Sequence, residues 1–180
     1  MDTEYLIDPS KYIDNNKLPA LVDLVEEFSK QELSHLWVDV GEAHVGRSIN
    51  WKSIAYDLRD KVFSSKELEE KMAPIVKYAE TIEGLNRITI NFLEGYSFMP
   101  VHVDGEGLEE YDTSNGSYNI IVSVTDHGQS IVDYIVIKNK KGYPLIFDGQ
   151  VPHGAMNDTL QTRITMFLLV DKTRFINDSP

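Results

Sequence analysis

The sequence predicts a mainly β protein, an antiparallel sandwich or jelly roll with flanking helices. The strongest indication is the region after residue 86, where short apolar and β-branched segments alternate with turns that contain Gly, Asn or Asp. A second indication is that no helix of about 10 to 15 residues separates these segments, which argues against a Rossmann-type sheet. Helices are therefore expected only on the N-terminal side of the sheet.

Two helices are expected in the first half of the chain. Residues 18 to about 33 carry apolar side chains at spacings of three and four, which place them on one face of a helix: Leu21, Leu24, Val25 and Phe28. A second helix is predicted from Ser64, a hydroxyl cap three residues before Glu67. Pro74 is expected to split or kink this second helix, because proline cannot donate the backbone hydrogen bond that a helix interior needs.

The strands are predicted from segments rich in aromatic and β-branched residues. Two short strands lie between the helices, at 36–40 and 51–56, and the others are expected at 87–92, 98–103, 118–124, 131–137, 144–147 and 163–170. His153 is expected to begin the penultimate strand. The chain is interpreted as a single domain over 1–180, with a flank of helices and strands at 1–85 and a jelly-roll core at 86–171.

Composition excludes several classes of function. The net charge of −12 gives no electrostatic footprint for nucleic acid or for an anionic membrane. No secretory signal and no apolar run of about 18 residues is present, so a cytoplasmic location without a membrane partner is expected. The absence of cysteine excludes thiolate zinc sites, iron–sulfur clusters and cysteine nucleophiles. The sequence carries no signal for an oligomeric state.

His102 and Asp104 are the first candidate metal ligands. They lie two residues apart at the end of a predicted strand, and positions i and i+2 of a strand project to the same face. One more histidine would complete a triad of two imidazoles and one carboxylate, which suits non-haem iron(II) and leaves coordination positions open. A His-x-Asp spacing alone is close to chance in a chain of this composition, so the third ligand decides the interpretation.

Four histidines remain for the third position, and His153 has the most favourable context. His35 closes a helix, His44 lies in a loop-like stretch, and His127 occupies a turn beside Asp126 and Gly128, where an exposed side chain is expected. His153, in contrast, follows Phe-Asp-Gly at a predicted strand start. The predicted metal ligands, which are also the predicted catalytic residues, are therefore His102, Asp104 and His153.

Arg163 is the candidate for binding a carboxylate. It opens an apolar strand, where a charge needs a partner, and a structural partner such as Asp148 is the alternative. If residues 157–161 form a hairpin that brings His153 near Thr165, parity places Arg163 and His153 on the same face of one sheet. Its guanidinium would then grip the far carboxylate of a metal-chelating keto acid.

The pattern His102-x-Asp104, His153 and Arg163 resembles the iron(II)- and 2-oxoglutarate-dependent oxygenases. Residues 145–163, with Phe-Asp before His153 and an Asn-x-Thr turn before Arg163, are similar to the aspartyl/asparaginyl β-hydroxylase family, which includes free-proline hydroxylases. The resemblance implies a double-stranded β-helix of cupin-like type. It also implies iron(II), 2-oxoglutarate as cosubstrate and O2, with succinate and CO2 released as an amino acid, free or in a polypeptide, is hydroxylated.

The chain departs from the family at the strand after the His-x-Asp loop. That strand usually supplies an Arg and a His to 2-oxoglutarate, whereas residues 117–123 contain neither. A neutral hydrogen bond from Tyr118 or Asn119 is expected to replace them, and both alternatives stay open. Five of the nine residues at 104–112 are acidic, and they are expected to face solvent or to select a cationic substrate.

Two other classes of function compete with the hydroxylase. One is a cupin-like metalloenzyme that holds the same triad without 2-oxoglutarate, and Arg163 separates it from the first hypothesis. The other is a non-catalytic jelly-roll binding protein with incidental histidines, which predicts no tight metal binding.

Overall fold

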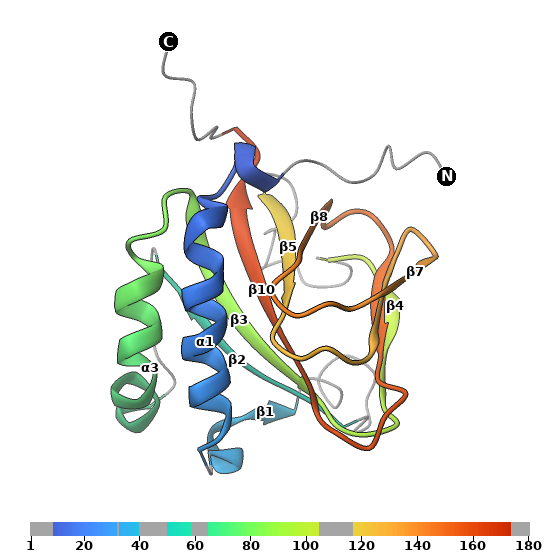
Figure 1. Cartoon of the computed structure of the whole chain (residues 1–180), viewed down its shortest axis with the longest axis horizontal. Coiled ribbons are helices and arrows are strands. Elements are labelled where there is room, and N and C mark those ends of the chain that lie inside the picture. The colour runs from blue at the N-terminus through green and yellow to red at the C-terminus, as the bar shows by residue number, and fades with distance from the viewer. Residues whose placement is uncertain (1–8, 32, 40–49, 59–64, 105–116, 174–180) are drawn as a thin grey trace.

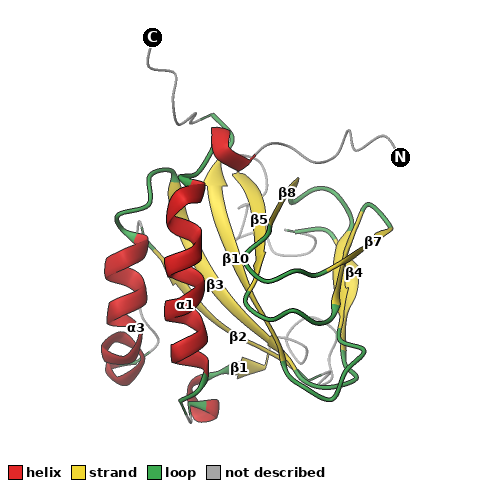
Figure 2. Ribbon diagram, in the orientation of Figure 1, coloured by secondary structure: helices red, strands yellow, loops and turns green. Residues whose placement is uncertain are grey.

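The computed structural model describes residues 9–31, 33–39, 50–58, 65–104 and 117–173. These residues form two β-sheets packed face to face and a layer of helices that covers the outer side of the larger sheet (Figures 1 and 2). No described helix combines the length and the apolar character needed to cross a membrane. The predicted fold class, mainly β with flanking helices, is confirmed.

The helical layer consists of α1 and α3, which lie side by side against the larger sheet (Figure 1). The helices are η1 (Pro9–Lys11), η2 (Asn15–Lys17), α1 (Leu18–Ser29), η3 (Ser34–Leu36) and α3 (Lys66–Ala79). One face of α1 is buried as its periodicity predicts, through Leu21, Val25 and Phe28. The helix ends earlier than expected, and His35 falls in η3.

Helix α3 corrects the prediction for its region. Its N-cap is Ser65, whose side chain accepts a hydrogen bond from Leu68 N at 3.1 Å. The helix continues through Pro74 without being split. An interior proline costs about 3 kcal/mol, and the buried side chains of Met72 and Ile75 on either side of it anchor both halves of the helix to the core.

The main hydrophobic core lies between the helices and the outer face of the larger sheet. This sheet has the order β1-β2-β3-β10-β5-β8. Its strands are β1 (Val38–Asp39), β2 (Trp51–Asp57), β3 (Leu85–Leu93), β5 (Ser117–Ser123), β8 (Pro144–Asp148) and β10 (Arg163–Asp171). Alternate residues of its central strands, such as Ile90, Met166 and Leu168, are buried against the helices, so the residues between them face the smaller sheet.

The smaller sheet has the order β4-β9-β6-β7, with β4 (Phe98–His102), β6 (Gln129–Val132), β7 (Ile135–Lys138) and β9 (His153–Met156). The strand predicted at 131–137 is in fact the hairpin β6–β7. It is joined by Asp133 and Tyr134, whose φ angles of 49° and 61° form a two-residue turn with positive φ at both positions. The turn contains no glycine, so the sequence pattern did not indicate that a turn divides this segment.

The predicted hairpin between His153 and Thr165 is wrong. β9 pairs with β4 and β6 in the smaller sheet, whereas β10 pairs with β3 and β5 in the larger one. His153 and Arg163 therefore belong to opposite walls of the sandwich. From β3 onward the strands are distributed between the two sheets as in a double-stranded β-helix, which confirms the predicted fold type.

Candidate metal centre

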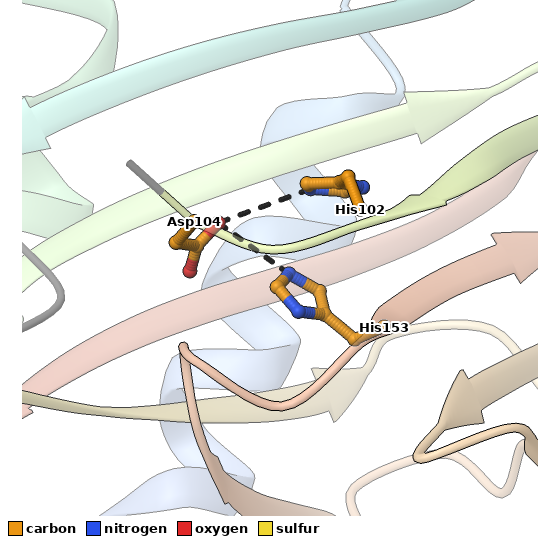
Figure 3. Close-up of side chains that lie close together, drawn as sticks. All are labelled: His102, Asp104 and His153. Atoms are coloured by element: carbon orange, nitrogen blue, oxygen red, sulfur yellow. Dashed lines mark ion pairs between the residues drawn. The ribbon is translucent and has the colours of Figure 1, made fainter. Parts of the chain in front are cut away.

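His102, Asp104 and His153 come together where β4 and β9 run side by side. β4 and β9 are antiparallel neighbours, and His102 is directly opposite His153 in their register. Asp104 follows two residues after His102 (Figure 3). The ligand atoms of all three residues lie within 4.8 Å of one another.

The carboxylate of Asp104 faces both imidazoles. Its Oδ1 lies 3.4 Å from Nε2 of His153 and 3.8 Å from Nε2 of His102, as the dashed lines in Figure 3 mark. Donors bound at right angles about 2.1 Å from one ion are about 3 Å apart. Small movements of these side chains therefore suffice to place all three donors on one cation.

Both imidazoles are held in the orientation that a metal requires. Nδ1 of His102 donates to the carbonyl of Pro100 at 2.8 Å, and Nδ1 of His153 donates to the carbonyl of Val151 at 2.9 Å. Because Nδ1 donates to a carbonyl, Nε2 is the atom that faces Asp104 in each case, and it offers its lone pair once a metal displaces any proton there. Such a backbone partner commonly orients a metal-binding histidine.

Asp104 is itself fixed by its surroundings. Asn119 donates from Nδ2 to Oδ2 of the carboxylate, and the Asp104 N–H donates to the carbonyl of Gly149 at 3.0 Å. Gly149 leaves room for this carboxylate, because a Cβ there would lie 2.9 Å from Oδ2 of Asp104. Gln150 adds a contact from Nε2 to the Asp104 carbonyl at 3.3 Å.

The carboxyl of Asp104 is held in the ionised form. Burial is the largest single influence and by itself would raise its pKa. The hydrogen bond and charge of His153, the Asn119 amide and the charge of His102 together outweigh burial, so the pKa of Asp104 is lowered. With a metal bound in place of any Nε2 protons, an ionised carboxylate and two imidazoles are the donor set that suits iron(II).

Arg163 is buried in the interior, with 2% of its surface exposed. Nη2 donates to Oγ of Ser130 at 2.9 Å, across the sandwich in β6. In the amide orientation that satisfies both residues, Asn139 accepts from Nε and Nη2 at 2.6 and 3.0 Å. These partners are neutral, and among the described residues no carboxylate lies within 4.0 Å of the guanidinium. Asp148, the alternative partner expected for Arg163, pairs with Lys172 instead.

The guanidinium nevertheless carries a charge near neutral pH. Burial lowers the pKa of Arg163 to about 10, which is still well above 7. Gly128 makes room for the side chain, since a Cβ at that position would lie 2.5 Å from Cδ of Arg163. A buried cation with only neutral partners is costly, and an anionic ligand would offset that cost.

Thr165 is a buried polar residue close to Arg163 whose position the sequence did not predict. It lies two residues after Arg163 on β10, on the same inner face, and is 1% exposed. Within the described segments, its Oγ1 has no hydrogen-bond partner. The period of two along this strand was the available signal, because Thr165 is polar at an inward position. Ser130 and Asn139 had no such signal, since only the hairpin brings them to Arg163.

The two alternatives at β5 occupy opposite faces. Asn119 is buried and contacts Asp104, whereas Tyr118 packs against Tyr12 on the helical side, with ring centroids 4.9 Å apart. The structure thus brings Asn119, but not Tyr118, to the cluster of His102, Asp104 and His153, here called the metal-type ligands. His127, expected to be exposed, is half-buried and bonds to the Thr162 carbonyl. His44 and most of the acidic stretch, 105–112, lie outside the described residues.

Comparisons with known proteins support the fold. No protein-family model matches the chain, and no curated protein matches it. Among solved structures, a prolyl-4-hydroxylase from Pseudomonas putida is similar over 88% of this chain and 90% of its own, at 15% identity and a TM-score of 0.52. A cupin protein from Desulfovibrio desulfuricans covers 47% of this chain and 70% of its own, at 20% identity and a TM-score of 0.36. At 15% identity, the similarity to the prolyl-4-hydroxylase shows the fold alone.

Proposed function

We propose that this protein is an iron(II)- and 2-oxoglutarate-dependent oxygenase that hydroxylates an amino acid, free or within a polypeptide. The observation that carries the proposal is the combination of two features on facing walls of one sandwich. One is a two-histidine, one-carboxylate cluster with its imidazoles oriented for metal binding. The other is the buried Arg163 guanidinium with only neutral described partners.

The spacing between these features suits a short keto acid. Ser130, which holds the guanidinium, lies opposite Ala155 in the β6–β9 register, two residues from the pair of Val132 and His153. Two residues of a strand span about 7 Å. A five-carbon keto diacid has one carboxylate for Arg163 and a chelating keto-carboxylate end for the metal, so it can bridge this distance.

Thr165 adds a second donor for the same ligand. Its unpartnered hydroxyl is inside the sandwich on the same strand face as Arg163. A carboxylate bound there would accept from both the guanidinium and the hydroxyl, which would satisfy a buried polar group that is otherwise costly. This arrangement supports an acidic cosubstrate more strongly than the cupin-like alternative without one.

The roles of the protein residues follow from this geometry. Bound iron would supply the oxidative chemistry with O2 and the keto acid. His102, Asp104 and His153 would hold that ion on one side and leave the other positions accessible, and Asn119 would keep the Asp104 carboxylate oriented. The rings of Phe147 and Phe167, with centroids 4.9 and 6.3 Å from that of His153, would keep water from this side of the centre.

Cosubstrate binding and turnover test the proposal. Full-length protein loaded anaerobically with iron(II) should develop a visible charge-transfer absorption on addition of 2-oxoglutarate, and should release succinate once oxygen is admitted. Arg163→Gln should bind iron as wild type does but lose keto-acid binding by at least tenfold. Lys141→Gln, which removes a surface cation paired with Glu26, is the matched control. Iron binding without keto-acid binding or succinate release would favour a cupin-like metalloenzyme that does not use 2-oxoglutarate. Equally weak metal binding by wild type and His102→Ala would favour a non-catalytic binding protein.

A further inference from the structure

The inner face of the larger sheet carries a half-buried patch beside the metal-type ligands. On β2 and β3, Ile54, Ile88 and Ile90 are buried under the helices. The intervening residues therefore face inward. The half-buried residues of this inner face, here called the inner patch, are Ser53, Ala55, Arg87, Thr89, Phe167 and Leu169.

The inner patch is unusual for the interior of a sandwich. Inward-facing residues of two packed sheets are normally apolar and buried, as Ile121 and Val132 are here. The patch instead combines one cation and two hydroxyls with the apolar side chains of Phe167 and Leu169, and all of them retain partial exposure. A mixed, accessible inner surface of this kind is suited to ligand binding rather than to core packing.

The strand register places Arg87 close to the metal-type ligands. Leu169 of β10 is opposite Asn119 on one side and opposite Arg87 on the other. Antiparallel neighbours are about 5 Å apart, so the Cα atoms of Arg87 and Asn119 are separated by about 10 Å. Asn119 contacts the Asp104 carboxylate. Phe167 lies opposite Thr89, and its ring centroid is 6.3 Å from that of His153. The inner patch therefore extends to His153 as well.

Arg87 is a half-buried cation of the inner patch. Across the part of the chain that the structure describes, it has no ion pair and no side-chain hydrogen bond, in contrast to Lys52 of β2, which is paired with Glu94 at 2.9 Å. Arg163 is the other arginine of this inner face, and its neutral partners hold it on the side of β6 and β7. The two guanidinium groups thus serve different regions of the interior.

We propose that Arg87 binds a carboxylate of the substrate, whose apolar part lies on Phe167 and Leu169. A guanidinium recognises a carboxylate through two parallel hydrogen bonds, and partial desolvation strengthens that pairing. The inference rests on the proposed function, because it assigns a second small molecule to the same centre. It deepens that function by naming the substrate class, a carboxylate-bearing amino acid or peptide. A cationic substrate, one of the two expectations from the acidic stretch at 104–112, is the alternative.

Calorimetric titration tests this assignment without turnover. The full chain is loaded with zinc(II) as a redox-inert metal. Three sets of probes are then titrated into it in the presence and in the absence of 2-oxoglutarate. The probes are free L-amino acids, the matching amino acid amides, and end-blocked peptides that contain Asp or Glu. Wild type, Arg87→Gln and the control Lys52→Gln are compared. At least one carboxylate probe should bind to wild type and to Lys52→Gln equally, and about 10- to 100-fold more weakly to Arg87→Gln.

The probe sets identify the source of the carboxylate. Loss of binding on amidation points to the α-carboxylate of a free amino acid, and binding by end-blocked peptides points to an acidic side chain. If 2-oxoglutarate fails to bind while Arg87-dependent binding persists, the proposed function fails and this inference stands. Equal affinities of all probes for wild type and Arg87→Gln would overturn it. So would a loss of melting temperature in Arg87→Gln with no change in probe affinity, because that result assigns the arginine a structural role.

Discussion

Asn119 donates a hydrogen bond from its side-chain amide to Oδ2 of Asp104, which directs the other oxygen of that carboxylate toward both histidines. The contact joins two strands of different sheets: Asp104 follows β4 of the smaller sheet, and Asn119 lies in β5 of the larger one. The metal-type ligands therefore belong to the smaller sheet, and a residue of the larger sheet orients the carboxylate among them. Their geometry depends on the packing of the two sheets as well as on the spacing of His102 and Asp104.

Removing this contact should weaken metal binding. Asn119→Ala should reduce affinity for iron(II) or zinc(II) about 10- to 100-fold, as is usual when an outer hydrogen bond to a ligand is lost. Tyr118→Phe is the matched control, because the neighbouring side chain points to the helical side and should leave affinity unchanged. Titration against a competing chelator measures both. Unchanged affinity in Asn119→Ala would show that the amide does not orient the ligand.

Thr165→Val should separate stability from cosubstrate binding. The substitution keeps the shape and removes a buried hydroxyl that has no partner, so the ligand-free protein should be as stable as wild type or more stable by about 1 kcal/mol. Affinity for 2-oxoglutarate should fall about fivefold, because one neutral hydrogen bond is worth about 1 kcal/mol. Chemical denaturation and anaerobic keto-acid titration provide the two measurements. A destabilised variant with normal keto-acid affinity would contradict both expectations.

Gly149→Ala should disturb the metal ligands through a steric clash. The added Cβ would lie 2.9 Å from Oδ2 of Asp104 and 3.4 Å from the Asn119 amide nitrogen, so the carboxylate must move. Metal affinity should fall at least tenfold, comparable to the loss of an outer-shell contact. Far-ultraviolet circular dichroism and a thermal melt establish that the fold is retained. A folded variant with wild-type metal affinity would show that the Asp104 carboxylate tolerates displacement.

Trp51 provides an optical signal for metal binding. Its ring centroid is 6.0 Å from that of His102, and its indole N–H donates to Oδ1 of Asn91 at 3.0 Å. A paramagnetic ion such as cobalt(II) bound at the cluster should quench its fluorescence. The other tryptophan, Trp37, is stacked on Phe92 on the helical side. Trp51→Phe should therefore lose most of the quenching and retain the Trp37 emission, whereas equal quenching in both proteins would place the ion elsewhere.

The positions of most strands along the chain and the candidate ligand residues were predictable because both depend on local spacing. The period of two and the turn residues located most of the β-strands, and the His-x-Asp spacing placed two donors on one side of a strand end. His153 was identified by its context, and the structure brings it opposite His102 in the β4–β9 register. The continuity of α3 through Pro74 and the hairpin β6–β7 were missed. The first depends on tertiary packing around Pro74, and the second on a turn with no glycine.

By itself, then, the sequence determined which residues have the chemistry of a metal ligand and which strands present them. Only the tertiary structure decided that Arg163 faces His153 from the other sheet, and that Asn119 rather than Tyr118 reaches Asp104. It also decided that Arg87 faces the same interior. The physical reason is that local periodicity specifies only which face of a strand a side chain occupies. The residue that it meets across the sandwich depends on strand pairing and on how the two sheets pack. These relations join residues that are far apart in the chain.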